Sequence, residues 1–275
     1  MNFRNIFAAI ALTLGCVAAS AQTDTTFFID GSMGRLSTRL QLPELREGEK
    51  CPVVVICHGF TGNKNEPLLS AIADKLVSIG IGAIRCDFNG HGQSEGEFVN
   101  MTVLNEIDDA LAVIDYVRRM PQSDRISVLG HSQGGVVAAM VAGQLGSGVI
   151  RSAVLMAPAA VLRDDALRGS TMGASYDPWH APEYVELFGH KLGRAYIQTA
   201  LSLPIYETAA RYDGPALVIH GMADRVVPYT YGERFGREMP DCTVQLLPGD
   251  DHGFTADMEG AAEMAADWLA GTLLK

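Results

Sequence analysis

The feature that most constrains this chain is an apolar run that passes through a glycine-flanked serine into a second run of small apolar residues. Residues 126–129, Ile-Ser-Val-Leu, are typical of a buried strand, and residues 135–142, Gly-Val-Val-Ala-Ala-Met-Val-Ala, can form a helix. Between them, residues 130–134 read Gly-His-Ser-Gln-Gly. A strand that turns directly into a helix strains the apical residue, and only flanking residues without bulk permit the turn. The pattern therefore predicts a nucleophilic hydroxyl at Ser132, exposed at one end of a sheet.

A second stretch of the chain matches the same Gly-x-Ser-x-Gly pattern. Residues 92–96 read Gly-Gln-Ser-Glu-Gly, but they follow Asn-Gly-His rather than a strand, and residues 97–100 begin no obvious helix. We therefore interpret this stretch as a glycine-rich surface turn and favour Ser132 over Ser94 as the nucleophile.

Apolar runs with the character of buried strands alternate with segments that can be helical. The run at residues 53–57 is continuous and β-branched, as in a strand buried on both faces of a parallel sheet. Similar runs occur at residues 82–86, 126–129, 153–156, 216–219 and 244–247, and predicted helices at 67–78, 103–120, 136–144 and 260–274. Two segments near the start, 27–30 and 36–42, are expected to be edge strands. The order predicts one α/β domain over residues 22–275, with a mostly parallel, doubly wound sheet and helices on both faces.

One interval interrupts this alternation. From Pro158 to about Arg211 no strand is apparent, and the interval contains four prolines and short helical stretches. An excursion of this length without function is uncommon in a compact domain. We therefore predict an insertion at residues 158–211 that forms a lid at the carboxyl edge of the sheet.

The charge and the first residues of the chain limit where the protein acts and on what. With 21 basic and 32 acidic residues, the formal net charge is −11, which argues against nucleic acid and anionic membrane surfaces as partners. Residues 1–21 combine Arg4, a short apolar stretch and Ala-Ser-Ala at 19–21, a pattern typical of a secretory signal peptide cleaved near Ala21. We therefore expect an exported protein, periplasmic or secreted, without a membrane span in the mature chain.

The cysteine and histidine spacings do not indicate a metal or a disulfide framework. The chain contains no C-x-x-C and no H-E-x-x-H, so we predict neither a metal nor an organic cofactor. Four cysteines follow the signal segment, and their spacing predicts no disulfide pair: Cys51, Cys57, Cys86 and Cys242.

A serine hydroxyl needs a neighbouring base, and that base needs an orienting acid. Asp224 lies in the loop after the strand-like run 216–219, and His252 lies in the loop after the last run. Chain order and loop position favour His252 as the base over six other histidines: His58, His91, His131, His180, His190 and His220. Asp250 and Asp251 are rival acids, but they lie on the same short loop as His252. We predict Asp224 as the acid because it can approach the imidazole from a neighbouring strand end.

Two backbone amides are candidates for stabilising a negatively charged oxygen. Gln133 follows the nucleophile and opens the predicted helix, so its N–H points toward the reacting carbonyl. Residues 58–62, His-Gly-Phe-Thr-Gly, follow the first buried strand, and Gly59 allows close backbone approach. We predict that the N–H groups of Phe60 and Gln133 form an oxyanion hole.

Five motifs together resemble the bacterial cinnamoyl (feruloyl) esterases of the α/β-hydrolase superfamily. Residues 58–64, 87–92 and 130–136 are widespread hydrolase features, whereas Asn-Met-Thr-Val-Leu-Asn-Glu-Ile at 100–107 and Leu-Pro-Ile-Tyr-Glu at 203–207 are more specific. The resemblance implies hydrolysis of hydroxycinnamic esters of sugars or simple alcohols through an acyl-enzyme, with the insertion as an α/β lid.

The same resemblance implies which residues bind the substrate. Asp165 matches the lid acid that hydrogen-bonds the phenolic hydroxyl, Tyr206 matches a tyrosine at the same ring edge, and Met172 stands where a glutamine is expected. The implied partner is a small aromatic ester, which in nature can be attached to plant cell-wall saccharide. Whether the chain forms a homodimer stays open, as do two enzymatic alternatives, a general short-chain carboxylesterase and a peptidase-like serine hydrolase. A third alternative is a non-catalytic binding protein on a hydrolase scaffold, although such proteins typically lose a triad residue.

Overall fold

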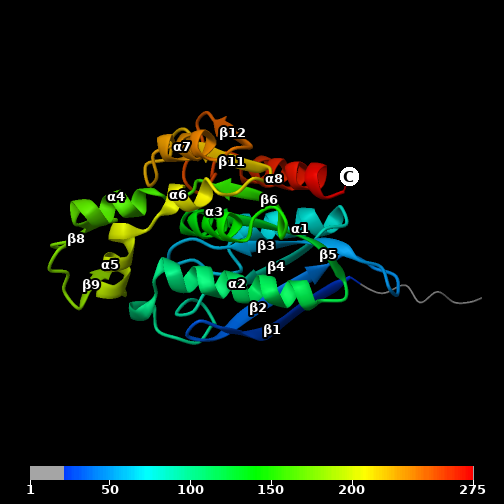
Figure 1. The fold of residues 1–275 in the computed structure, drawn as a ribbon, viewed down its shortest axis with the longest axis horizontal. Helices are drawn as coiled ribbons and strands as arrows, with labels where there is room; N and C mark the ends of the chain where they lie inside the picture. The colour runs from blue at the N-terminus through cyan, green and yellow to red at the C-terminus, as the bar shows by residue number, and fades with distance from the viewer. Residues whose placement is uncertain (1–21, 275) are drawn as a thin grey trace, which may run out of the picture.

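An eight-stranded sheet forms the centre of the protein in the computed structural model, which describes residues 22–274 (Figure 1). The predicted signal peptide, residues 1–21, lies outside the described residues. The strand order is β1-β2-β4-β3-β5-β6-β11-β12. These strands are β1 (Thr23–Gly31), β2 (Gly34–Leu42), β3 (Cys51–Cys57), β4 (Gly82–Cys86), β5 (Ser123–His131), β6 (Ile150–Met156), β11 (Ala216–Gly221) and β12 (Cys242–Leu247).

The sheet is mostly parallel, as the alternation of runs predicts. From β4 to β12 every neighbouring pair is parallel, and only β2 runs in the opposite direction, antiparallel to both β1 and β4. The expectation of two edge strands holds for β1 alone, because β2 pairs with β1 on one side and with β4 on the other. The carboxyl ends of the parallel strands therefore meet at one edge of the sheet, and the loops that follow them lie near one another.

Helices cover both faces of the sheet (Figure 1). One face packs against α1 and α8, and the other against α2, α3 and α7. Their bounds are α1 (Pro67–Ser78), α2 (Val103–Arg119), α3 (Gln133–Leu145), α7 (Thr230–Glu238) and α8 (Met258–Leu273), with a 3-10 turn at Phe98–Asn100. Helix α7 was not predicted from the sequence, because most of its residues are polar and only Gly232 and Phe235 are buried.

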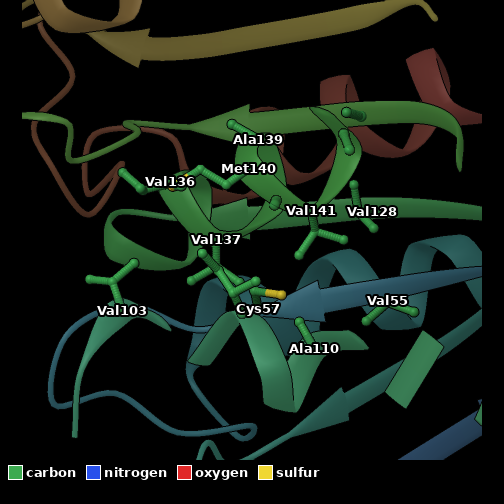
Figure 2. Close-up of a cluster of buried hydrophobic side chains, with 14 of the residues drawn as sticks. Val55, Cys57, Val103, Ala110, Val128, Val136, Val137, Ala139, Met140 and Val141 are labelled. Atoms are coloured by element: carbon green, nitrogen blue, oxygen red, sulfur yellow. The ribbon is translucent and has the colours of Figure 1, made fainter. Parts of the chain in front are cut away.

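The largest core lies between the sheet and helices α2 and α3. Side chains alternate along β3, so Val55 and Cys57 face this core while Val54 and Ile56 face α1 and α8. Figure 2 shows Val55 and Cys57 with Val128 and the small apolar residues of α3 around Val137. Because α3 is buried nearly all round, its start, which carries the glycine-flanked serine, is held rigidly against the sheet.

The interval 158–211 between β6 and β11 forms an insertion with its own short elements. Its helices are α4 (Val161–Arg168), α5 (Arg194–Ser202) and α6 (Ile205–Ala209). Two small hairpins lie between α4 and α5, one formed by β7 (Ser170–Thr171) and β8 (Ala174–Ser175) and the other by β9 (Tyr184–Leu187) and β10 (His190–Gly193). The expectation of no strand here was wrong, because these strands pair only within the insertion and are too short for a periodic pattern. Helices α4 and α5 lie beyond one end of the sheet (Figure 1).

Three negative findings concern residues 22–274. None of the helices there is both long and apolar enough to cross a membrane. No group of three or more His, Cys, Asp or Glu side chains in this part of the chain is arranged to hold a metal ion. The four cysteines of this part are free thiols, and three of them are buried.

Candidate active site

Ser132 occupies the sharp turn between β5 and α3. Its backbone lies at φ 56° and ψ −123°, a strained conformation for a residue with a side chain. A side chain at Gly130 would overlap the carbonyl of Gly134, and one at Gly134 would overlap the backbone of His58. Both glycines are therefore required by the close approach of the backbone. The turn leaves the Ser132 side chain at the carboxyl edge of the sheet, as predicted.

The structure brings Ser132, His252 and Asp224 together in one hydrogen-bonded chain. The Ser132 hydroxyl lies 2.9 Å from Nε2 of His252 and donates to it, and Nδ1–H of His252 donates to Oδ2 of Asp224 at 2.7 Å. These residues come from three separate loops, which follow β5, β12 and β11. The imidazole is thus oriented on one side and can accept a proton from the serine on the other.

Hydrogen bonds from four groups hold the carboxylate of Asp224. Oδ1 accepts the backbone N–H groups of Val226 and Val227, each at 2.8 Å, and Oδ2 accepts from His220 Nε2 at 3.1 Å as well as from His252. Burial by itself raises the pKa of Asp224, but the hydrogen bonds from His220 and His252 outweigh it and hold that pKa well below its usual range. Asp224 is therefore a fixed negative charge behind the imidazole.

Two other histidines support this arrangement rather than compete for it. His220 bonds the carbonyl of Val227 at 2.9 Å and also contacts the Asp224 carboxylate. The His131 side chain lies against the His252 ring, with centroids 5.0 Å apart, and its Nε2–H donates to the His252 carbonyl at 2.8 Å. Burial lowers the pKa of His131 to about 4, so it acts as a neutral donor that anchors the loop.

The other candidates have structural surroundings of their own. His58 is fully buried and accepts the N–H of Phe88 at 3.0 Å. The Ser94 hydroxyl accepts the backbone N–H of Ser37 and donates to the carbonyl of Asp87, so the second Gly-x-Ser-x-Gly stretch is a hydrogen-bonded turn. Asp251 binds the backbone of its own loop, with bonds to Gly253 and Thr255.

The two predicted oxyanion amides border the same cavity as Ser132. Phe60 and Gln133 both line it, and within residues 22–274 neither backbone N–H donates to a backbone carbonyl. Gln133 is the first residue of α3, so its N–H is one of the amides that a helix leaves without an internal partner. Gly59 lies so close to Ser132 that a side chain there would contact the serine Cβ at 3.0 Å. The loop after β3 therefore approaches the nucleophile through its backbone.

A buried ion pair connects that loop to the loop after β4. Lys64 and Asp87 are almost fully buried, and Nζ lies 2.7 Å from Oδ2. The backbone N–H of Lys64 also donates to Asp87, and the N–H of Gln93 donates to the same carboxylate. This pair was not predicted from the sequence, although both residues belong to the motifs at 58–64 and 87–92. The pair fixes the loop that carries Phe60.

The insertion supplies one wall of a cavity of about 180 Å³ beside Ser132. Asp165 and Met172, which the resemblance implies as substrate-binding residues, both line this cavity. Burial raises the pKa of Asp165, and Met172 occupies the turn between β7 and β8 with φ 48°. The remaining wall from the insertion and from the loop after β11 consists of Ala159, Val161, Leu162, Thr171, Tyr196, Val226 and Val227. The wall is predominantly apolar.

The structure corrects the predicted position of Tyr206. Its hydroxyl donates to the carbonyl of Tyr231 at 3.1 Å, and its ring packs on Phe235 and under the guanidinium of Arg234. It lines a different cavity, of about 260 Å³, which does not include Ser132. The physical reason is that Tyr206 lies on α6, which packs against α7 on the other side of α4 from the serine. The tyrosine beside the serine is Tyr196, on α5.

Tyr196 belongs to a buried hydrogen-bonded chain behind the nucleophile. Its hydroxyl donates to Oε1 of Gln133 at 2.8 Å, and Nε2 of Gln133 donates to Glu106 at 2.8 Å. Burial raises the pKa of Glu106 from 4.5 to about 8, so this acid is protonated at neutral pH. The chain ties α2, α3 and α5 together. Glu106 is the last acid of the motif at 100–107, but nothing in its spacing indicates these partners.

Comparison with known proteins places the chain in a family. Residues 48–199, more than half of the sequence, match the family described as serine aminopeptidase, S33. The chain belongs to this family of α/β-hydrolases. Est1E from Butyrivibrio proteoclasticus, whose structure contains bound ferulic acid, is 30% identical and superposes with a TM-score of 0.86 over 90% of this chain and 100% of its own.

Other proteins similar to this α/β-hydrolase match it at lower identity or over a smaller part of the chain. The mitochondrial palmitoyl-protein thioesterase ABHD10 of Rattus norvegicus is 24% identical over 80% of this chain and 77% of that protein. The mouse ABHD10 structure superposes with a TM-score of 0.68 at 20% identity, over 90% of this chain and 99% of that chain. An uncharacterised 31.7 kDa Escherichia coli protein is 33% identical, but the match covers only 31% of this chain and 30% of that protein. The family and the characterised relatives of the chain described here are serine hydrolases, and we conclude that this protein is a serine hydrolase of the esterase type.

Proposed function

We propose that the protein hydrolyses hydroxycinnamic esters such as feruloyl esters. One observation carries the proposal: the hydrogen-bonded Ser132–His252–Asp224 chain opens on an apolar cavity with an acid, Asp165, in its wall. The bound ferulic acid of Est1E, a structural neighbour with 30% identity, supports the same acyl group.

The reaction follows from the hydrogen-bond directions at the serine. Ser132 Oγ attacks the ester carbonyl while His252 Nε2 takes its proton, and the carbonyl oxygen becomes an oxyanion that accepts the N–H groups of Phe60 and Gln133. His252, held by Asp224, returns the proton to the leaving alcohol. Water then attacks the acyl-enzyme by the same route and releases the acid.

The acyl group occupies the cavity wall that the insertion supplies. The ring of a cinnamoyl group packs on Val161, Leu162 and Met172, and a thioether is a favourable contact for an aromatic ring. Asp165 accepts the phenolic hydroxyl. Tyr196 donates its own hydroxyl proton to Gln133 and presents lone pairs to the cavity. It is therefore a second hydrogen-bond acceptor for a substrate hydroxyl group. In this role the insertion acts as a lid.

The test compares methyl ferulate hydrolysis by the wild type, S132A and S94A. We expect S132A to lower kcat by about ten-thousand-fold or more, because no other group can form the acyl-enzyme. A fluorophosphonate probe should label the wild type and S94A but not S132A. Undiminished turnover by S132A would refute the assignment of the nucleophile.

A substrate panel separates this proposal from a general short-chain carboxylesterase. We expect methyl ferulate, coumarate and caffeate to give a higher kcat/KM than short aliphatic esters, because a short acyl chain leaves the apolar wall in contact with water. A preference for the aliphatic esters would overturn the aromatic acyl group while leaving the triad unaffected.

A further inference from the structure

Glu66 is an acid of the catalytic cavity that the proposed reaction does not use. It is the residue before α1, at the end of the loop that follows β3, and it lines the same cavity as Ser132 and His252. Its Oε1 lies directly over Gly62, where any added side chain would collide with it. The N–H of Gly62 closes a turn onto the carbonyl of Gly59, and this turn contains Phe60. The carboxylate thus lies beside the turn that carries Phe60.

This carboxylate is partly desolvated and has no cationic partner of its own. Burial raises the pKa of Glu66 to about 6, whereas a backbone hydrogen bond from Asn63 and the nearby His252 lower it. Within residues 22–274 it forms no ion pair with a lysine or arginine. Holding an acid in this state costs stability, which a solvated side chain at this position would avoid. A carboxylate that is ionised near neutral pH, and that borders a cavity, accepts hydrogen bonds strongly.

During ester hydrolysis the groups on the reacting carbon face different sides of the cavity, and Glu66 lies on one of these sides. Of the groups on the tetrahedral carbon, the oxyanion faces Phe60 and Gln133, and the acyl chain extends along the apolar wall of the insertion. The leaving oxygen must face His252, which protonates it. Glu66 lines the cavity together with His252, and it comes from the loop after β3 rather than from the insertion. It therefore borders the alcohol half of the substrate.

We propose that Glu66 forms a subsite for the alcohol and selects esters of polyhydroxylated alcohols, such as a sugar or a polyol, by accepting a hydrogen bond from a second hydroxyl group. This inference rests on the proposed ester hydrolysis and adds the chemistry of the leaving group. A methyl or simple alkyl alcohol has no second hydroxyl and makes no such bond. A carboxylate at this point also disfavours anionic alcohols.

The experiment measures kcat/KM for methyl ferulate and 5-O-feruloyl arabinose with the wild type, E66Q, E66A and D165N. Hydrogen bonds to charged groups are strong, so we expect E66A to lower the ratio of sugar ester to methyl ester by about ten-fold or more, mainly through KM, with E66Q intermediate. D165N serves as the matched control on the acyl side. This substitution should lower kcat/KM for both substrates by the same factor and leave the ratio of the two values unchanged.

Three results would overturn the subsite. An unchanged ratio of sugar ester to methyl ester in E66A would do so. Equal decreases in kcat/KM for both substrates in E66A and in E66Q would also do so, since they indicate a structural role at the Gly62 turn. A larger loss for a 2-aminoethyl ester than for the sugar ester would show that the acid selects a cation instead. Failure of the proposed acyl specificity is distinguishable, because the wild type would then hydrolyse aliphatic esters but not ferulates. The same ratio would in that case be measured with methyl and glyceryl butyrate.

Discussion

At the residue scale, Asp224 is the group whose role depends most on hydrogen-bond direction. Its Oδ1 accepts two backbone N–H groups and its Oδ2 faces two histidine rings. In D224N the amide oxygen must stay with the two backbone donors, so the NH2 group faces His252. The imidazole then carries its proton on Nε2 and cannot accept one from Ser132. We expect kcat to fall by about ten-thousand-fold, measured on methyl ferulate.

The control for this prediction is D251N, on the loop of His252. Asp251 is partly exposed to solvent and bonds only groups of its own loop, so its substitution should cost far less activity than D224N. Comparable losses in the two variants would show that Asp224 does not orient the base. Circular dichroism of both variants would check that they are folded.

The same residues show how much of the candidate site can be predicted from sequence. Ser132, Asp224 and His252 were predictable because each lies in the turn or loop that follows a strand of the parallel sheet, so the sheet itself brings them together. Tyr196 was missed and Tyr206 chosen because, in an insertion without sheet order, the sequence does not indicate which way a tyrosine faces. The contacts of Glu106 and Lys64 depend on side chains from distant elements, which no local spacing encodes.

At the scale of elements, the buried Lys64–Asp87 pair joins the loops after β3 and β4. Removing one partner of a buried ion pair leaves an uncompensated charge, which typically costs about 3–5 kcal/mol. We expect K64M to lose stability on this scale in urea denaturation at pH 7. The double variant K64M/D87N should lose less than K64M alone, because the remaining asparagine is neutral. A K64M variant within 1 kcal/mol of the wild type would contradict this account.

The predicted elements succeeded or failed for reasons that also lie at this scale. Long runs such as β3 and β11, buried on both faces, leave a continuous apolar signature, and the sheet order of the parallel part follows from it. The hairpins β7–β8 and β9–β10 have strands of two and four residues, in which period-two alternation cannot be recognised. In helix α7 only Gly232 and Phe235 are buried, so no run of apolar residues marks it in the sequence.

At the scale of the whole molecule, the buried Glu106 makes folding stability depend on pH. Below about 4.5, the ordinary pKa of this acid, the folded and unfolded states both carry its proton. Between about 4.5 and 8 the folded state alone retains it, so unfolding releases a proton and the free energy of unfolding falls as pH rises. Above about 8 the acid is ionised in both states and this contribution to the slope ends.

Glu106 should therefore impose a slope of up to about 1.4 kcal/mol per pH unit, which the isosteric E106Q variant lacks. Urea denaturation at half-unit steps from pH 4.5 to 9 measures both curves. The difference between them should favour E106Q increasingly up to about pH 8 and then become constant. The control is E47Q, at an exposed position in the loop between β2 and β3, which should run parallel to the wild type. Parallel curves for E106Q and the wild type would mean that the acid behind Gln133 is ionised in the folded protein, and that the chain from Glu106 to Tyr196 carries a charge toward the acyl cavity.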